Sequence, residues 1–286
     1  SFYDYVLWAK FLSGNSEMEQ YFGLAGIAGI SIITAFVFAF SLSKFRLHAQ
    51  LYYFVRVMVR YRLALAMLGF GLIKIFPMQQ PFPSLSNLHT NYGDFLPWKI
   101  YFHTVGITPK YEIFFGIIEI LAGVLLLFRR TTTFGAGIAL GFMANVFAAN
   151  IAYKIGQGPL ALPLILMALF LFANDFLRLF NLLILEKTTR AETFEPQYSG
   201  SFTPVLARVL KSVFVLIFCV YAFLTYQNYQ NAPYKIPTNA ALKNTYGFYS
   251  VKEFKLNGQT LPYSDTDQRR WQNVIFEKWA TMTIKT

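Results

Sequence analysis

Two glutamates, Glu112 and Glu119, lie in a stretch of the chain that is otherwise strongly apolar, and Glu119 is the stronger candidate for chemistry. It lies well inside the stretch 111–128, about 12 Å along the axis of a helix that begins at residue 111. A charge at this depth in a membrane is costly, so Glu119 is a candidate for proton transfer or for a polar contact with a quinone head or a partner helix. The structural alternative is an ion pair with Arg62 of the preceding apolar stretch.

Glu112 precedes Glu119 by seven residues, close to two helical turns, so the two carboxyl groups share nearly one helix face. Glu112 lies near the end of its apolar stretch. We interpret it as a structural ion-pair candidate whose partner is Lys74, at the end of the preceding stretch. A catalytic role for Glu112 is the less favoured alternative.

Polar side chains also occur in the next two apolar stretches. Asn145 and Asn150, followed by Tyr153, are predicted to form hydrogen bonds between helices, or else to line a polar pocket. Asp175 and Arg178 are three residues apart, a spacing typical of a structural ion pair on one helix face. We assign no chemistry to that pair.

Other residue types argue against several classes of function. The single cysteine, Cys219, cannot form an internal disulfide or a CxxC pair, so any redox role needs a cofactor, a quinone or a partner. The histidines, His48, His89 and His103, lie outside the apolar stretches, which disfavours a haem buried between helices. Asp94 lies between the last two, which leaves a metal site as an alternative, but the irregular spacing favours no metal there. No phosphate loop, dinucleotide motif or Ser-His-Asp signature is present.

The elements that position these residues are apolar stretches long enough to cross a bilayer. Hydrophobic residues make up 55% of the chain and charged residues 14%, against about 25% in a typical soluble domain. Each stretch has about 20 residues, enough for an apolar layer roughly 30 Å thick. We therefore predict an all-α polytopic membrane protein, a bundle of about six transmembrane helices over residues 22–42, 56–76, 111–128, 132–151, 160–180 and 205–226.

Lysine and arginine predict the orientation of these helices. The segments that link helices one and two, three and four, and five and six hold most of the positive charge, which favours the cytoplasm. We expect a multi-pass protein of the bacterial inner membrane, with the loop 77–110 and the C-terminal tail on the periplasmic side. The same rule explains the net charge of +11, because positive residues flank membrane-spanning helices. We therefore expect the lipid bilayer as a partner, and not nucleic acid. Because the chain starts without Met and ends in a strand-like pattern, we expect further residues at both ends.

Two regions outside the apolar stretches have patterns of their own. The segment 77–110 is long for a loop and rich in proline and aromatic residues, which predicts a folded cap on the outer face. Residues 249–256 alternate, Asn257-Gly258 signals a hairpin, and residues 271–285 predict a short helix or turn and then a strand. We divide the chain into an N-terminal segment with the first helix (1–55), a core (56–183), a cytoplasmic linker with the last helix (184–226) and a periplasmic β-rich tail (227–286).

The core resembles the DoxX family of bacterial membrane proteins. The most specific block is Glu119-x-x-x-Gly123-x-x-Leu126-Leu127-Phe128-Arg129-Arg130-Thr131-Thr132. Further matching stretches are 60–75, 80–85, 92–94, 115–118, 150–154 and 166–169, and residues 253–258 and 270–271 resemble the tail of longer Bacteroidetes-type members. Longer members carry a cysteine or an acidic residue near Tyr153. This chain has Ala152 and Lys154 there, which weakens any transfer of thiol or acid chemistry to that turn.

The resemblance implies a DoxX-like four-helix core and a link to redox chemistry. Some family members look like membrane subunits of quinone-linked oxidoreductases, including thiosulfate oxidation, and others associate with redox-stress enzymes. We therefore expect an integral-membrane subunit of a redox-linked complex, with a protein partner and no covalently bound cofactor. Glu119, Lys74 and Arg62 would line a polar pocket for a quinone head. Whether the chain is itself an enzyme stays open.

A second interpretation is a non-catalytic membrane scaffold. In it the outer loop and the β-rich tail bind a periplasmic or cell-envelope partner, and the helices anchor them. The lack of buried histidine, cysteine pairs and nucleotide motifs favours this interpretation. A transporter is a weaker third option, because no inverted repeat with broken helices is visible.

Overall fold

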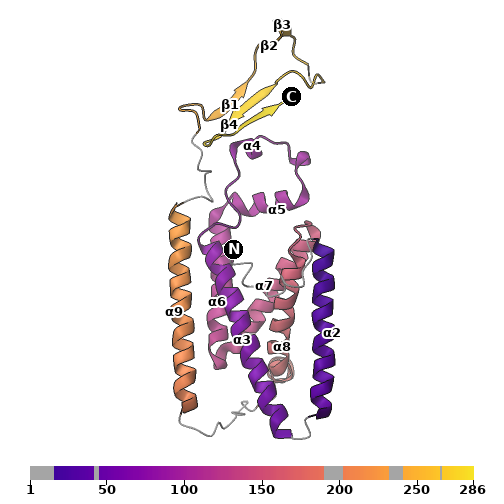
Figure 1. Cartoon of the computed structure of the whole chain (residues 1–286), viewed down its shortest axis with the longest axis vertical. Helices are drawn as coiled ribbons and strands as arrows, with labels where there is room; N and C mark the ends of the chain where they lie inside the picture. Colours follow the sequence, from indigo (N-terminus) through magenta and orange to yellow (C-terminus); the bar gives the residue numbers. More distant parts are fainter. Residues whose placement is uncertain (1–15, 42–44, 190–201, 232–240, 265) are drawn as a thin grey trace. The chain divides into compact units, whose positions relative to one another are not determined.

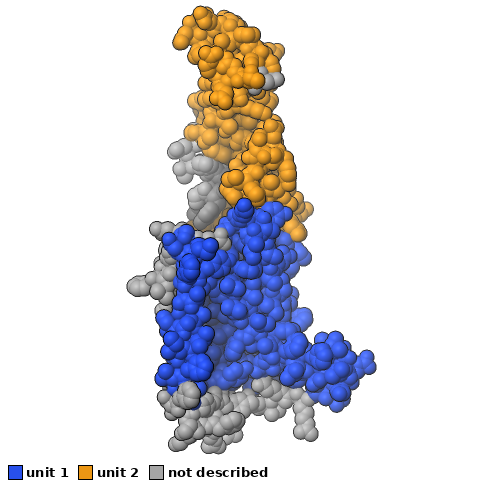
Figure 2. Space-filling model, turned by 90° about the vertical axis from the view of Figure 1, so that its right-hand side faces the viewer, with its two compact units in different colours: residues 1–75, 114–220 blue, residues 76–113, 221–286 orange. Residues whose placement is uncertain are grey.

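The computed structural model describes residues 16–41, 45–189, 202–231, 241–264 and 266–286, and Figure 1 shows their helices and strands. Contacts divide the chain into two compact units, coloured separately in Figure 2. We call residues 1–75 with 114–220 the helical unit, and residues 76–113 with 221–286 the mixed unit. The predicted N-terminal segment, linker and tail fall in part outside the described residues, and the predicted domain boundaries stay an interpretation.

Six long helices cover the apolar stretches: α2 (Glu17–Ser41), α3 (Phe45–Ile75), α6 (Pro109–Leu127), α7 (Thr132–Ala152), α8 (Gly158–Leu183) and α9 (Phe202–Asn231). Within the described residues, four are long and apolar enough to cross a membrane, over Met18–Val37, Arg129–Ala152, Gly158–Leu183 and Lys211–Gln230. The chain is therefore a helical membrane protein. α3 and α6 lie outside this set because charged residues interrupt their apolar sequences, so the count of about six spans stays a prediction.

The core of the helical unit lies between α3, α6, α7 and α8. Its fully buried members combine large and small side chains, among them Leu63, Met67, Leu126, Ala136 and Ala168. Small residues let helices approach closely, and in lipid this fit stabilises helix contacts more than apolar burial does. By contrast α2 and α9 expose most of their apolar side chains, as expected of surfaces that face lipid.

Two glycines bring α3 and α6 into backbone contact. A Cβ atom added at Gly71 would lie 2.9 Å from the Gly116 carbonyl oxygen, and one at Gly116 would lie 2.7 Å from the Gly71 carbonyl oxygen. Farther along the same contact, a Cβ at Gly123 would lie 2.6 Å from Leu68 Cγ. Any larger residue would push the antiparallel helices apart, so these glycines set the distance that side chains must bridge between them.

The segment 76–113 of the mixed unit is folded, as the sequence predicted. It contains α4 (Leu85–Leu88), the 3-10 helix η2 (Tyr92–Asp94) and α5 (Pro97–Gly106). A Cβ added to Gly106 would lie 2.6 Å from the Pro81 carbonyl oxygen, so the end of α5 packs directly on the backbone before α4.

The C-terminal part of the mixed unit forms a three-stranded antiparallel sheet in the order β1 (Gly247–Ser250), β4 (Asn273–Phe276), β5 (Met282–Lys285). A separate hairpin joins β2 (Phe254–Leu256) to β3 (Gln259–Leu261), with Asn257 and Gly258 at φ values of 52° and 81°. This confirms the Asn-Gly turn, because both positions favour residues that tolerate positive φ.

Two expectations for this region were wrong. Residues 249–256 are not one strand: β1 pairs with β4, whereas β2 pairs with β3 in another sheet. In residues 271–285 the predicted final strand is present as β5, but a strand, β4, stands where a short helix or turn was predicted. Alternation predicts extended backbone, but the partner of each strand depends on contacts between distant residues.

Candidate functional site

The Lys74–Glu119 ion pair joins α3 to α6 inside the helical unit. Lys74 Nζ lies 2.6 Å from Glu119 Oε1, Glu119 is fully buried, and Lys74 is 8% exposed. The Lys74 ammonium also lies 5.8 Å from the ring centroid of Phe70 and 5.6 Å from that of Phe142. Aromatic faces attract cations, so the pair is enclosed by side chains that favour the charged lysine.

The predicted alternative, an Arg62–Glu119 pair, is wrong. Arg62 and Lys74 are both on the continuous helix α3, twelve residues or about 18 Å apart along its axis. A Cβ atom at Gly71 would lie 2.6 Å from Ile120 Cγ1, and one at Gly116 would lie 2.7 Å from Ile75 N, so the neighbouring residues Glu119 and Lys74 both lie at this helix contact. Arg62 is therefore too far from Glu119, and the three residues predicted to line one pocket do not meet.

Glu112 is fully buried near the start of α6. Its Oε1 accepts hydrogen bonds from the backbone N–H groups of Gln79 at 3.0 Å and Gln80 at 3.2 Å. These contacts hold the chain where it leaves α3, and they give Glu112 a structural role. The predicted pair with Lys74 stays a prediction.

The polar residues of α7 separate into two groups. Asn150 is buried, donates from Nδ2 to the Val146 carbonyl at 2.8 Å and accepts from the Gln157 N–H at 2.9 Å. It therefore fastens the turn between α7 and α8, where Lys154 has a φ of 52°. Asn145 and Tyr153 are exposed.

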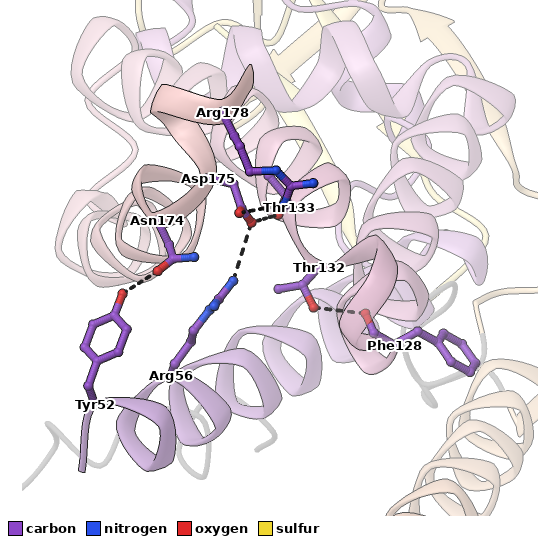
Figure 3. A network of polar contacts seen from close by, with 8 residues as sticks. All are labelled: Tyr52, Arg56, Phe128, Thr132, Thr133, Asn174, Asp175 and Arg178. Atoms are coloured by element: carbon purple, nitrogen blue, oxygen red, sulfur yellow. Dashed lines mark hydrogen bonds and ion pairs between the residues drawn. The ribbon is translucent and has the colours of Figure 1, made fainter. Parts of the chain in front are cut away.

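Asp175 of α8 is the centre of a polar network that joins three helices (Figure 3). The predicted contact with Arg178 is present, with Nη1 3.4 Å from Asp175 Oδ1. Arg56 of α3 approaches Asp175 Oδ2 at 3.5 Å, and the Thr133 hydroxyl of α7 donates to the same oxygen. One buried carboxylate thus receives donors from α3, α7 and its own helix.

Sequence reasoning missed most of this network. The Tyr52 hydroxyl donates to Asn174 Oδ1 at 2.7 Å. Figure 3 shows this bond beside the Arg56–Asp175 contact, and both run from α3 to α8. The spacing of Tyr52 and Arg56, one turn apart on α3, could have indicated a polar face directed at a neighbour. The identity of that neighbour could not be read from the sequence.

The histidines of the mixed unit pack against aromatic rings. His89 stacks on Phe248 with ring centroids 4.6 Å apart, and His103 lies edge-on to Phe95 at 4.9 Å. Burial, aided by the charge of Lys99, lowers the pKa of His103 below the ordinary value. Across the described part of the chain no cluster of three metal-ligating side chains occurs.

The two buried networks differ in what they can do chemically. The Lys74–Glu119 pair could move a proton between an amine and a carboxylate, and Glu119 Oε2 has no hydrogen-bond partner among the described residues. The Asp175 network has donors on both carboxylate oxygens, as expected of a structural contact.

Comparison with known proteins gives one partial match. No protein-family model matches the chain, and no solved structure matches it. Over 70 residues the chain is 40% identical to a Bacillus subtilis (strain 168) protein described as uncharacterized protein YwoB. The match covers 24% of this chain and 46% of that protein, so the chain spans less than half of that relative. That description gives no activity, and function is therefore inferred from the residues of this chain.

Proposed function

We propose that this protein is a membrane-anchored scaffold whose mixed unit binds a protein partner. The observation that carries the proposal is the contact of Glu277 with the start of α4. Glu277 is 2% exposed and accepts the backbone N–H groups of Ser86 at 2.7 Å and Leu85 at 3.2 Å. These residues are 191 and 192 positions away in sequence. A single carboxylate thus links the loop between two helices to the C-terminal sheet.

Further contacts make this part of the chain one folded body. Arg270 is 2% exposed and donates to the carbonyls of Val251, Leu261 and Trp271. It thereby ties the β2–β3 hairpin to the three-stranded sheet. A flexible tail does not need buried charges with several hydrogen bonds each, such as Glu277 and Arg270. A surface that recognises a partner must keep its shape, and these contacts would fix it.

The exposed apolar residues of the mixed unit offer a surface for such a partner. Tyr92 is 73% exposed and Leu242 is 72% exposed. Large apolar side chains that face water singly are common, but aromatic residues are enriched where proteins bind one another. We propose a periplasmic or cell-envelope protein as the partner.

Site-directed photo-crosslinking tests this proposal. A photoreactive amino acid at Tyr92 or at Leu242 should crosslink the same protein, whereas one at Ile33 on the lipid-facing helix α2 should not. Glu277→Ala should reduce both crosslinks, and Glu119→Ala should leave them unchanged. No protein adduct from either position, or adducts equally strong from Ile33, would overturn the proposal.

A second candidate is the redox-linked, quinone-interacting membrane subunit implied by the DoxX resemblance. The observation that favours it is Glu119: one oxygen binds Lys74, and the other is buried without a hydrogen-bond partner among the described residues. A half-satisfied carboxylate within a helical bundle is suited to accept a proton or a quinone hydroxyl. The link from this carboxylate to redox chemistry comes from the resemblance to the DoxX family.

Lipid extraction tests the second candidate. Purified wild-type protein should carry quinone, and Glu119→Gln should lose it, while the exposed Glu253→Gln control keeps it. If wild-type protein carries no quinone and membrane redox activity is the same in a Glu119→Ala strain, the redox proposal fails. The scaffold proposal does not depend on this result.

The orientation is also a proposal: six spans in the bacterial inner membrane, with the C-terminal tail in the periplasm. The positive residues around the short links between helices support it. Cys219 is the only cysteine, so Cys219→Ser gives a background for single-cysteine labelling. An impermeant maleimide should label Tyr263→Cys in intact spheroplasts and should label Arg130→Cys only after lysis. The reverse pattern would contradict the orientation.

A further inference from the structure

A pocket lies between α3 and the turn that joins α6 to α7. It is a small, partly open hollow lined by Tyr53, Arg56, Val57, Arg60, Arg129 and Thr132. The first four follow the spacing i, i+3, i+4, i+7, which places them on one face of α3. The other two belong to the 3-10 helix η3 (Arg129–Thr131) and to the start of α7.

The charges around this pocket are strongly positive. Three arginines and no carboxylate line it. The nearest carboxylate in the contacts described above, Asp175, shares its charge between Arg56 and Arg178. Lys211 of α9 adds another cation at the same turn, because its Nζ lies 4.4 Å from the ring centroid of Phe128. Positive charge gathered in a concave site attracts anions.

Arg60 is the residue that points most directly to a ligand. Its Nε is buried and has no hydrogen-bond acceptor among the described residues. Its guanidinium lies 5.1 Å from the ring centroid of Tyr61. This contact positions the guanidinium but gives the Nε–H group no acceptor. Arg129 lies 5.9 Å from the ring centroid of Tyr53 on the opposite wall. A buried donor without an acceptor costs free energy that a bound anion would recover.

We propose that this pocket binds a phosphate group, through Arg60 and Arg129 with Arg56 beside them. Arginine forks match the geometry of phosphate oxygens and bind them with charge-assisted hydrogen bonds. The phosphate can come from the headgroup of an anionic phospholipid or from free phosphate, since both present the same oxygens. The inference is independent of the scaffold and redox proposals, because it uses neither Glu119 nor the mixed unit.

Native mass spectrometry of the detergent-purified full chain tests the phosphate site. Phosphatidylglycerol should bind more tightly than phosphatidylethanolamine, and the Arg60→Gln/Arg129→Gln variant should lose affinity for phosphatidylglycerol by about tenfold or more. Competition with inorganic phosphate distinguishes the sources. Displacement of the lipid shows that the anion alone is recognised, and persistence of the lipid shows that the headgroup is recognised with its chains.

Matched variants separate a built site from general attraction between arginine and lipid. Arg130→Gln and Lys187→Gln each remove one exposed positive charge outside the pocket and should change the affinity less than twofold. Equal losses in these controls and in the double variant would overturn the proposal. A photoreactive phosphatidylglycerol on wild-type protein adds a test that needs no variant: adducts should map to residues 53–60 and 129–132, and adducts elsewhere alone would contradict the site.

Discussion

The two units of this protein stabilise buried carboxylates in different ways. In the helical unit, Glu119 and Asp175 receive side-chain donors: Lys74 for the first, and Arg56, Arg178 and Thr133 for the second. In the mixed unit, Glu112 and Glu277 receive backbone N–H groups. The choice of donor follows the type of secondary structure around each carboxylate.

The physical reason is the supply of free backbone donors. Inside a long helix every N–H already bonds to a carbonyl four residues earlier, so a buried carboxylate there must find a side chain. At a helix start the first N–H groups have no such partner. Ser84 caps α4 by accepting the N–H of Asn87, and Glu277 takes the N–H groups of Leu85 and Ser86. The lesson is that breaks between helices supply anion sites that helix interiors lack.

The largest effect is expected when Lys74, the partner of Glu119, is removed. Lys74→Met leaves the Glu119 carboxylate buried without its cation, which should lower the free energy of unfolding by about 3–5 kcal/mol. Lys74→Met/Glu119→Leu should recover most of the loss, because apolar residues replace a buried pair at little cost. Denaturant titration in detergent measures the free energy of unfolding of both variants, and Lys110→Met, at an exposed position, serves as the control. A double variant no more stable than Lys74→Met would show that the pair has another role.

A smaller effect is expected at the backbone-bound carboxylate. Glu277→Gln keeps an acceptor but removes the charge, and should cost about 1.5–3 kcal/mol. The loss should be local: amide exchange of Leu85 and Ser86 should accelerate, while peptides of α7 and α8 keep their protection. Hydrogen exchange with mass spectrometry measures this, and Glu253→Gln on the surface serves as control. Unchanged exchange at α4 would mean that the Ser84 cap alone holds the helix start.

The Asp175 network should be less sensitive. Asp175→Asn keeps an acceptor for Thr133 but loses the ionic contacts, and should cost about 1 kcal/mol, because both contacts are long, at 3.5 and 3.4 Å, and one of the two arginines is largely exposed. Double-mutant cycles should give a larger coupling with Arg56, whose side chain is 17% exposed, than with Arg178, which is 44% exposed. Equal couplings would indicate that burial does not decide the strength of these contacts.

The smallest effect concerns the pH response of the mixed unit. Burial first, and the charge of Lys99 second, lower the pKa of His103. In the unfolded chain His103 has the ordinary histidine pKa of about 6.5, so as the pH falls it binds a proton there before it does in the folded chain. Stability should fall as the pH drops below that value and should be unaffected by His103 above it. Lys99→Met should move the His103 midpoint upward in an NMR titration, and an unmoved midpoint would leave burial as the whole cause.

The sequence by itself determined the features that depend on neighbours along the chain. Long apolar stretches gave the helices, because a bilayer requires about 20 apolar residues in a row. Asn257-Gly258 gave the hairpin, because both positions require positive φ. Asp175 and Arg178 gave a contact three residues apart. In each case, the residues that decide the outcome lie within one continuous segment of the chain.

Only the tertiary structure decided which distant groups meet. Lys74 and Glu119 are 45 residues apart, and the backbone contact of Gly71 with Gly116 selects Lys74 over Arg62 as the cation. Glu277 finds its donors 191 and 192 residues away, and the Arg60 pocket joins one face of α3 to the turn before α7. Such pairings depend on how helices and strands pack, and packing is set by side-chain fit between segments that the linear pattern does not align.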